Sequence, residues 1–142
     1  MANYVIAVDR DKVGHREATL RAEINLGLKR GYAGFLQEKS EVVDFLKEEY
    51  RSAVVGGRNF IPIGMQQTDL VYAFPVEGGV HAEAEPSLTL FSDKSPLYSD
   101  ESDEEWKEMV EALAVRLAKK FDQFRVYVTY TRVEVKILQR QG

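Results

Sequence analysis

The chain has 142 residues, 44% of them hydrophobic and 30% charged, which predicts a globular protein rather than a disordered one. At this length we expect one domain covering residues 1–142. The formal net charge of −4 argues against a protein that coats nucleic acid through general electrostatics, and the absence of cysteine excludes disulfides and thiolate chemistry. No apolar run suits a signal peptide or a membrane span, so we expect a cytoplasmic protein.

The first predicted element is a central strand over Tyr4–Val8, a continuous apolar run of the kind that is buried on both faces of a sheet. Asp9 and Asp11 follow it directly. This short pattern resembles the first motif of haloacid-dehalogenase-type phosphatases. The resemblance implies a Mg²⁺-dependent phosphohydrolase with Asp9 as nucleophile and Asp11 as general acid/base. The alternative is that two solvated acids end the strand at a turn.

Two helices are expected next. Leu20, Ile24 and Leu28 recur at i, i+4 and i+8, which predicts an amphipathic helix over residues 15–30 with Gly31 as its stop. A second helix should begin near Ser40, whose hydroxyl can cap it, and should end before Gly56.

Short apolar runs between glycine and proline breaks predict strands over residues 70–74 and 87–91. Because proline lacks a backbone N–H, Pro62 predicts an edge strand or a loop at residues 60–63. Residues 75–80 are predicted to form a hairpin turn. The polar segment 91–102 is expected to be a loop.

Ser102 and Glu105 match a capping box, which predicts a helix over residues 103–121. Beyond it, the apolar positions change parity between Tyr130 and Val133, which a single regular strand does not do. A hairpin at Thr131–Arg132 accounts for this change, and a bulge does so too. The whole order predicts an α+β fold with a mostly antiparallel sheet, about three helices and a C-terminal hairpin.

The segment 56–60 is the strongest candidate for ligand binding. Paired amides of Gly56 and Gly57 can converge on an anion, Arg58 can clamp a phosphate, and Phe60 can stack on a base, with Asn59 between them. Two further arginines, Arg125 and Arg132, would join Arg58 if the fold brings them together.

Other candidates have simpler interpretations. His81, Glu83 and Glu85 alternate on one face of an extended segment, and the outer two are too far apart to share a metal ion without other partners. Most aromatic residues follow strand or helix periodicity and are expected in the core, whereas Tyr98 lies in the polar loop.

Part of the second half resembles a small uncharacterised family of bacteria and their phages. The resemblance rests on the Glu85-Pro86-Ser87 strand and on the Phe121-Asp122-Gln123 turn that leads to Val126. It implies a phage accessory protein, which often acts by binding, either to a host protein or to a nucleotide signal.

The leading hypothesis is therefore a non-enzymatic, homo-oligomeric anti-defence protein that sequesters a small anionic nucleotide-type ligand without a cofactor. Mg²⁺ enters only in the phosphohydrolase alternative. A third hypothesis is an inhibitor of a host protein, which would bind through the acidic side chains of Glu104, Glu105 and Glu108.

Overall fold

The fold was analysed in a computed structural model that describes residues 3–30 and 35–141. The elements in chain order are β1 (Tyr4–Ile6), β2 (Val8–Asp9), β3 (Lys12–Val13), β4 (His15–Gly27), β5 (Lys29–Arg30), β6 (Phe35–Leu36), α1 (Lys39–Val55), β7 (Gly64–Val76), β8 (Gly79–Asp93), α2 (Asp103–Lys120), β9 (Tyr127–Lys136) and β10 (Leu138–Arg140). The fold is α+β with antiparallel strand pairing throughout, as expected. Two helices occur within the described residues, fewer than the three predicted.

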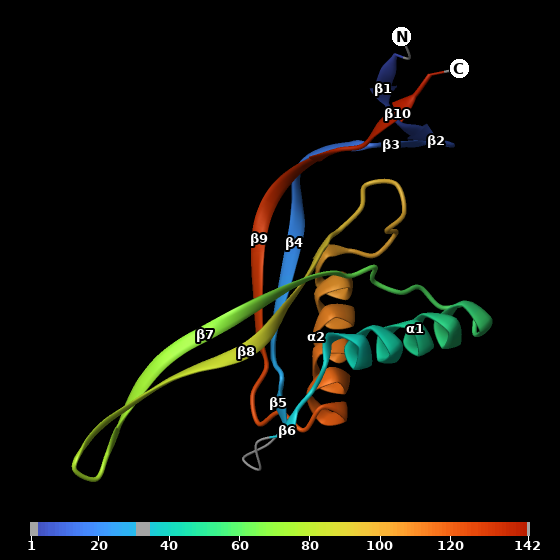
Figure 1. Ribbon diagram of the computed structural model, residues 1–142. Helices are drawn as coiled ribbons and strands as arrows, with labels where there is room; N and C mark the ends of the chain where they lie inside the picture. The colour runs from blue at the N-terminus through green and yellow to red at the C-terminus, as the bar shows by residue number, and fades with distance from the viewer. Residues whose placement is uncertain (1–2, 31–34, 142) are drawn as a thin grey trace.

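A four-stranded sheet in the order β7-β8-β4-β9 forms the centre of the molecule, and both helices lie on one side of it (Figure 1). Strand β4 replaces the helix predicted over residues 15–30, and the proposed stop at Gly31 lies outside the described residues. The spacing i, i+4, i+8 also fits a period of two. Ala22 and Leu26 fill the intervening even positions, so all the even residues from 20 to 28 are buried.

The predicted central strand at Tyr4–Val8 is also wrong. The chain there forms β1 and β2, two short strands that pair only with β10 and β3 in separate two-stranded ladders. Tyr4 and Val8 are exposed. An apolar run alone therefore does not predict a buried strand, because burial also requires other strands or helices that pack on its two faces.

Helix α1 extends over residues 39–55, as predicted, and buries Val42, Leu46 and Ala53. Its N-cap is Glu38 rather than Ser40, because the backbone N–H of Glu38 donates to the Glu41 carboxylate at 2.9 Å and Ser40 already lies inside the first turn. The Pro62 segment is a loop, and β7 and β8 join through the predicted turn, where Gly78 has φ +86°.

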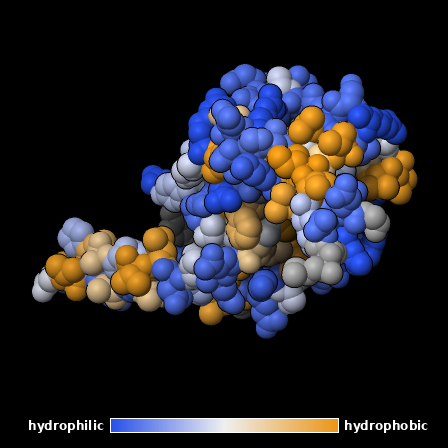
Figure 2. Space-filling model, turned by 90° about the horizontal axis from the view of Figure 1, so that it is seen from above, coloured by the Kyte–Doolittle hydropathy of each residue, from blue (hydrophilic) through white to orange (hydrophobic). Residues whose placement is uncertain are grey.

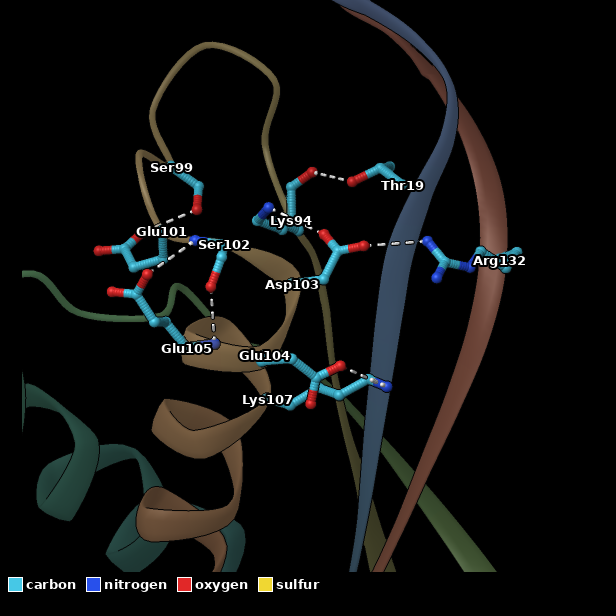
Figure 3. Close-up of polar contacts among 10 residues, drawn as sticks. All are labelled: Thr19, Lys94, Ser99, Glu101, Ser102, Asp103, Glu104, Glu105, Lys107 and Arg132. Carbon is cyan, nitrogen blue, oxygen red and sulfur yellow. Dashed lines mark hydrogen bonds and ion pairs between the residues drawn. The ribbon is translucent and has the colours of Figure 1, made fainter.

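Helix α2 begins at the predicted capping box. The Glu105 amide donates to the Ser102 hydroxyl at 3.2 Å, and the Ser102 amide donates to the Glu105 carboxylate at 3.4 Å (Figure 3). Trp106 and Leu117 are among the α2 residues that belong to the hydrophobic core, on the face of the sheet that the helices cover. The acidic first turn and Lys119 and Lys120 in the last turn suit the helix macrodipole.

A buried lysine fastens the start of α2 to the sheet. The Lys94 side chain is only 4% exposed, and its ammonium group donates to Asp103 at 3.0 Å. The other oxygen of Asp103 accepts from Arg132 on β9, also at 3.0 Å (Figure 3). The Thr19 hydroxyl donates to the Lys94 carbonyl at 2.9 Å. These contacts lower the pKa of Asp103, first through the Lys94 hydrogen bond and then through that from Arg132.

Strand β9 continues through Thr131 and Arg132 in regular register with β4, so the predicted C-terminal hairpin is wrong, and a bulge at this point of β9 is not observed either. The irregularity lies on the neighbouring strand, where Arg16 pairs with Val135 but Thr19 pairs with Val133. Val133 and Val135 therefore lie on the opposite face of β9 from Val128 and Tyr130, and the parity change marks a switch in which face of this strand is half-buried.

The far end of the β7–β8 hairpin projects away from the helices (Figure 1). Its strands pair from Gly64 with Phe91 to Val76 with Gly79. Apolar side chains remain exposed along it, including Leu70 at 56% and Val80 at 73%. Figure 2 shows orange, hydrophobic surface on the projecting arm. A two-stranded ribbon of this kind has no core of its own.

Candidate functional site

The sheet face that the helices leave uncovered holds an open groove of about 960 Å³. It is lined by residues from all four strands and from the α2–β9 connection. Its polar lining includes Asn25 on β4, Thr68 on β7 and Ser87 on β8, with Gln123 and Arg125 from the connection. We call it the open-face groove. Its size and its mixture of apolar and polar groups are those of a small-molecule site.

The Tyr72–Glu85 pair lies in this groove. The Tyr72 hydroxyl on β7 donates to the Glu85 carboxylate on β8 at 3.1 Å. The pKa of Tyr72 is raised to about 12, first by desolvation and then by the hydrogen bond to Glu85 and the negative charges of Glu85 and Glu83. Tyr72 therefore remains a neutral hydrogen-bond donor at neutral pH, and it holds the carboxylate in place.

Gly27 allows a close approach at the floor of the groove. A Cβ atom there would lie 2.6 Å from Oε1 of Gln123 and 3.3 Å from Oε1 of Glu85. The Gln123 side chain is fixed from the other side, because its amide donates to the Lys29 carbonyl at 2.7 Å and to the Phe121 carbonyl at 3.0 Å. The absence of a side chain at residue 27 thus brings an amide and a carboxylate together.

Two aromatic side chains lie at the rim of the same groove. Phe124 and Tyr127 line it and are largely exposed. The Arg125 guanidinium lies over the Phe124 ring, with 5.6 Å between Cζ and the ring centroid. A planar ligand could stack at this rim while its polar part reaches toward Glu85 and Gln123.

The segment predicted to bind an anion is divided in the structure. The amides of Gly56, Gly57 and Arg58 donate to the carbonyls of Ser52, Val54 and Ala53 at 3.0, 3.1 and 2.7 Å, so they terminate α1 instead of pointing at a ligand. Gly57 has φ +66°, the left-handed conformation common at helix ends. Arg58, Asn59 and Phe60 line a second groove, of about 730 Å³.

The three arginines proposed to converge have different surroundings. Arg58 lines the second groove and donates to the Ser52 hydroxyl at 3.0 Å, Arg125 lines the open-face groove, and Arg132 binds Asp103. A single cationic pocket made of all three is therefore not formed.

The other sequence candidates lie elsewhere. Asp9 is exposed at the end of β2, and Asp11 is exposed on the turn between β2 and β3, where Arg10 has φ +58°. Among the described residues, no group of three or more His, Asp or Glu side chains is placed to hold a metal ion. His81 is paired with Glu83 at 3.3 Å, and no helix within residues 3–30 and 35–141 is long and apolar enough to cross a membrane.

Most carboxylates of the acidic stretch, residues 93–111, form ion pairs or hydrogen bonds within the chain. Asp93 pairs with Arg21, Asp103 with Lys94 and Arg132, and Glu104 with Lys107, while Glu105 caps α2. A partner that needs free acidic side chains would have to compete with these contacts.

Sequence reasoning missed Tyr72 as a polar group, and it considered Glu85 only as a metal ligand beside His81 and Glu83 or as part of a solvated strand face. Both residues lie on strands in which side chains alternate between the covered and the uncovered face of the sheet. They are 13 residues apart in the chain and come into contact only because β7 and β8 pair in the observed register. The period-two pattern of residues 20–28 is the signal that would have revealed the sheet and hence this face.

Comparisons with known proteins bear on the fold. Neither a protein-family model nor a curated protein sequence matches the chain. Among solved structures, a phage SAM lyase in the apo state matches with a TM-score of 0.60 and 18% identity, over 95% of this chain and 94% of that one. A phage SAM lyase in complex with S-methyl-5'-thioadenosine matches with a TM-score of 0.58 and 18% identity, over 89% and 91% of the two chains. The protein thus shares its fold with phage proteins.

Proposed function

We propose that the protein binds a small adenosine-type ligand in the open-face groove and cleaves S-adenosylmethionine as a lyase. The observation that supports this most is the Tyr72–Glu85 pair at 3.1 Å inside a groove of about 960 Å³, on a fold shared with a phage SAM lyase along almost the whole chain. The expected nucleotide-type ligand is kept in this proposal, but the binding site and the non-enzymatic role are replaced.

The groove offers a partner to each part of such a substrate. The exposed rings of Phe124 and Tyr127 suit a base, and the side chains of Asn25 and Gln123 suit ribose hydroxyls. Arg125 suits the carboxylate of the methionyl part, since a guanidinium binds a carboxylate with two parallel hydrogen bonds. Arg125 therefore remains a ligand-binding residue in this proposal.

Glu85 would hold the sulfonium group. In the reaction, the bond from sulfur to the γ-carbon of the methionyl part breaks and its electron pair stays on sulfur, giving the neutral thioether S-methyl-5'-thioadenosine. Since a lyase uses no water, the substrate's own carboxylate oxygen bonds the γ-carbon and closes a lactone. Tyr72 positions Glu85, and the enzyme's task is to bring the substrate's reacting atoms together.

The test is to incubate the purified protein with S-adenosylmethionine and to follow S-methyl-5'-thioadenosine by chromatography. Glu85→Gln should lower kcat/KM by about 100-fold, and Tyr72→Phe should lower it less. Glu77→Gln is the matched control, because Glu77 lies in the exposed turn of the same hairpin.

The outcomes separate catalysis from sequestration. Release of S-methyl-5'-thioadenosine that depends on Glu85 supports the lyase. Saturable binding with the ligand recovered intact would replace it with the sequestration hypothesis. No binding of either compound would refute the assignment of the groove.

Self-association through the projecting arm is a second proposal, in line with the expected homo-oligomer. Val71 and Val80 lie exposed on the arm with no layer of this chain over them, so another copy can cover them. The molar mass from light scattering should exceed 16.2 kDa, and Val71→Ser with Val80→Ser should lower it. A wild-type monomer at high concentration would contradict this. The cytoplasmic location and the anti-defence role stay predictions.

A further inference from the structure

The second groove takes no part in the proposed lyase site. Its base is formed by Trp106 and Met109 of α2, and its walls come from the α1–β7 loop and the β8–α2 loop. We call it the Tyr98 groove. The Tyr98 groove and the open-face groove have no lining residue in common, so a ligand bound in one groove leaves the other free.

Three aromatic rings of this groove remain open to solvent. Tyr98 is 73% exposed, Phe60 is 43% exposed and Phe91 is also exposed. Phe60 is held in place by the Tyr50 ring, with centroids 4.8 Å apart. Gly64 lies under Phe91, since a Cβ there would come within 2.5 Å of the ring. The Phe60 ring is therefore packed against Tyr50 before any ligand binds, which lowers the cost of ordering it in a complex.

Glu101 supplies the polar recognition group. Oε1 accepts from the Asn59 amide, which joins the two loops, and Oε2 accepts from the Ser99 hydroxyl at 2.7 Å. Desolvation raises the pKa of Glu101, but the hydrogen bonds from Asn59 and Ser99 outweigh it and bring the pKa below its usual value. An ionised carboxylate has about four acceptor positions, so each of its two neighbouring oxygens can accept one further hydrogen bond.

Asp93 also lines the groove, but its carboxylate is paired with Arg21 at 2.7 Å. The positive charge in the groove comes from Arg58. Its guanidinium donates to the Ser52 hydroxyl at 3.0 Å, and among the described residues no carboxylate lies within ion-pair distance of it. A guanidinium with open donors binds a phosphate in bidentate fashion. The groove thus combines stacking rings, two adjacent acceptors and one anion-binding group.

We propose that the Tyr98 groove is a second ligand site that binds a guanine nucleotide. Guanine presents two adjacent N–H donors, N1–H and the 2-amino group, to the paired acceptors of Glu101, while Tyr98 and Phe60 stack on the ring and Arg58 binds the phosphate. Adenine presents a ring acceptor beside its single amino group, and that acceptor would face the carboxylate unfavourably. This proposal does not depend on the lyase activity.

The test is calorimetric titration of the full chain with GMP, IMP and AMP. Wild type should bind GMP about tenfold more tightly than IMP, which lacks the 2-amino group, and more tightly still than AMP. Tyr98→Ala should weaken GMP binding about tenfold, because stacking on an aromatic ring is lost. Arg58→Ala should weaken GMP but leave guanosine unchanged.

The controls distinguish this site from the lyase site. Glu101→Gln should abolish the preference for GMP over IMP, and circular dichroism melting checks that the variant folds. Phe124→Ala, which removes an exposed ring of the open-face groove, should leave GMP binding unchanged. Equal affinity for the three nucleotides, or GMP binding that survives Tyr98→Ala, would overturn the proposal even if the lyase assay succeeds.

Discussion

The two faces of the central sheet differ in what their side chains are used for. On the covered face, Leu26 and Leu88 pack against the two helices and are fully buried. On the uncovered face, Asn25 and Ser87 alternate with them along the same strands and line the open-face groove. Neighbouring residues of one strand therefore serve stability and binding separately. A substitution on one face should leave the property of the other largely intact.

The largest expected effect tests this separation inside one hairpin. Leu88→Ala should lower the free energy of unfolding by about 3 kcal/mol, because Leu88 is fully buried and its truncation leaves a cavity. Leu70→Ala, on the exposed arm of the paired strand, should change the free energy of unfolding of a single chain by less than about 0.5 kcal/mol. Urea denaturation at low protein concentration measures both. Equal losses would show that the arm is part of the core.

The next effect concerns the contact that holds α2 to the sheet. Asp103→Asn removes the charge opposite the buried Lys94 ammonium, and should cost about 2 kcal/mol after allowance for the partial exposure of Asp103. Denaturation of Asp93→Asn, whose partner Arg21 is solvated on the uncovered face, is the matched control and should show a smaller loss.

The same contact predicts a pH dependence. Because the pKa of Asp103 is lowered in the folded state, its contribution is present above the unfolded value of about 3.9 and is lost as the pH falls through the folded value. The difference in unfolding free energy between wild type and Asp103→Asn should therefore shrink below about pH 4. A difference that stays constant down to pH 2 would argue against the ion pair.

A smaller effect compares two serines at the starts of the helices. Ser102→Ala should cost about 1 kcal/mol, since the hydroxyl accepts from the Glu105 amide at the N-cap of α2. Ser40→Ala should cost much less, because Glu38 is the N-cap of α1. Thermal melting of both variants gives the comparison, and equal shifts would restore Ser40 as the cap.

The smallest change in stability is expected at Gly27, on the uncovered face. Gly27→Ala pushes the end of the Gln123 side chain, but alanine also favours the folded strand, so the net change should stay within about 1 kcal/mol. Binding of S-methyl-5'-thioadenosine should nevertheless weaken, because Gln123 and Glu85 are displaced. Unchanged affinity would remove these two side chains from the ligand site.

The sequence predicted those elements whose signals are local. The Ser102 capping box and the glycine turn of the β7–β8 hairpin depend on residues a few positions apart, and both are confirmed. The assignment of residues 15–30 failed because Leu20, Ile24 and Leu28 satisfy both a helical and an extended period, and strand partners decide between them. The hairpin expected at Thr131 failed because one continuous strand is half-buried first on one face and then on the other.

The candidate site was still less predictable. Tyr72 and Glu85 acquire a shared role only through the register of two strands, and Gly27 matters through what approaches it from Gln123, almost a hundred residues away. By contrast, Arg58, Asn59 and Phe60 were selected from sequence as ligand-binding residues. They do line one groove together, although the neighbouring glycine amides are used by α1.

The bulge between Arg16 and Thr19 has a consequence for how the protein can evolve. Strand β4 passes the extra residue before it reaches the part of the sheet that bears the open-face groove. A change of length in the short ladders β1–β10 and β2–β3 can be accommodated at this bulge. The register of β4 from Thr19 onward is set separately, by its pairing with β8 and with the start of β9. The geometry of the open-face groove is therefore insulated from changes of length in these ladders.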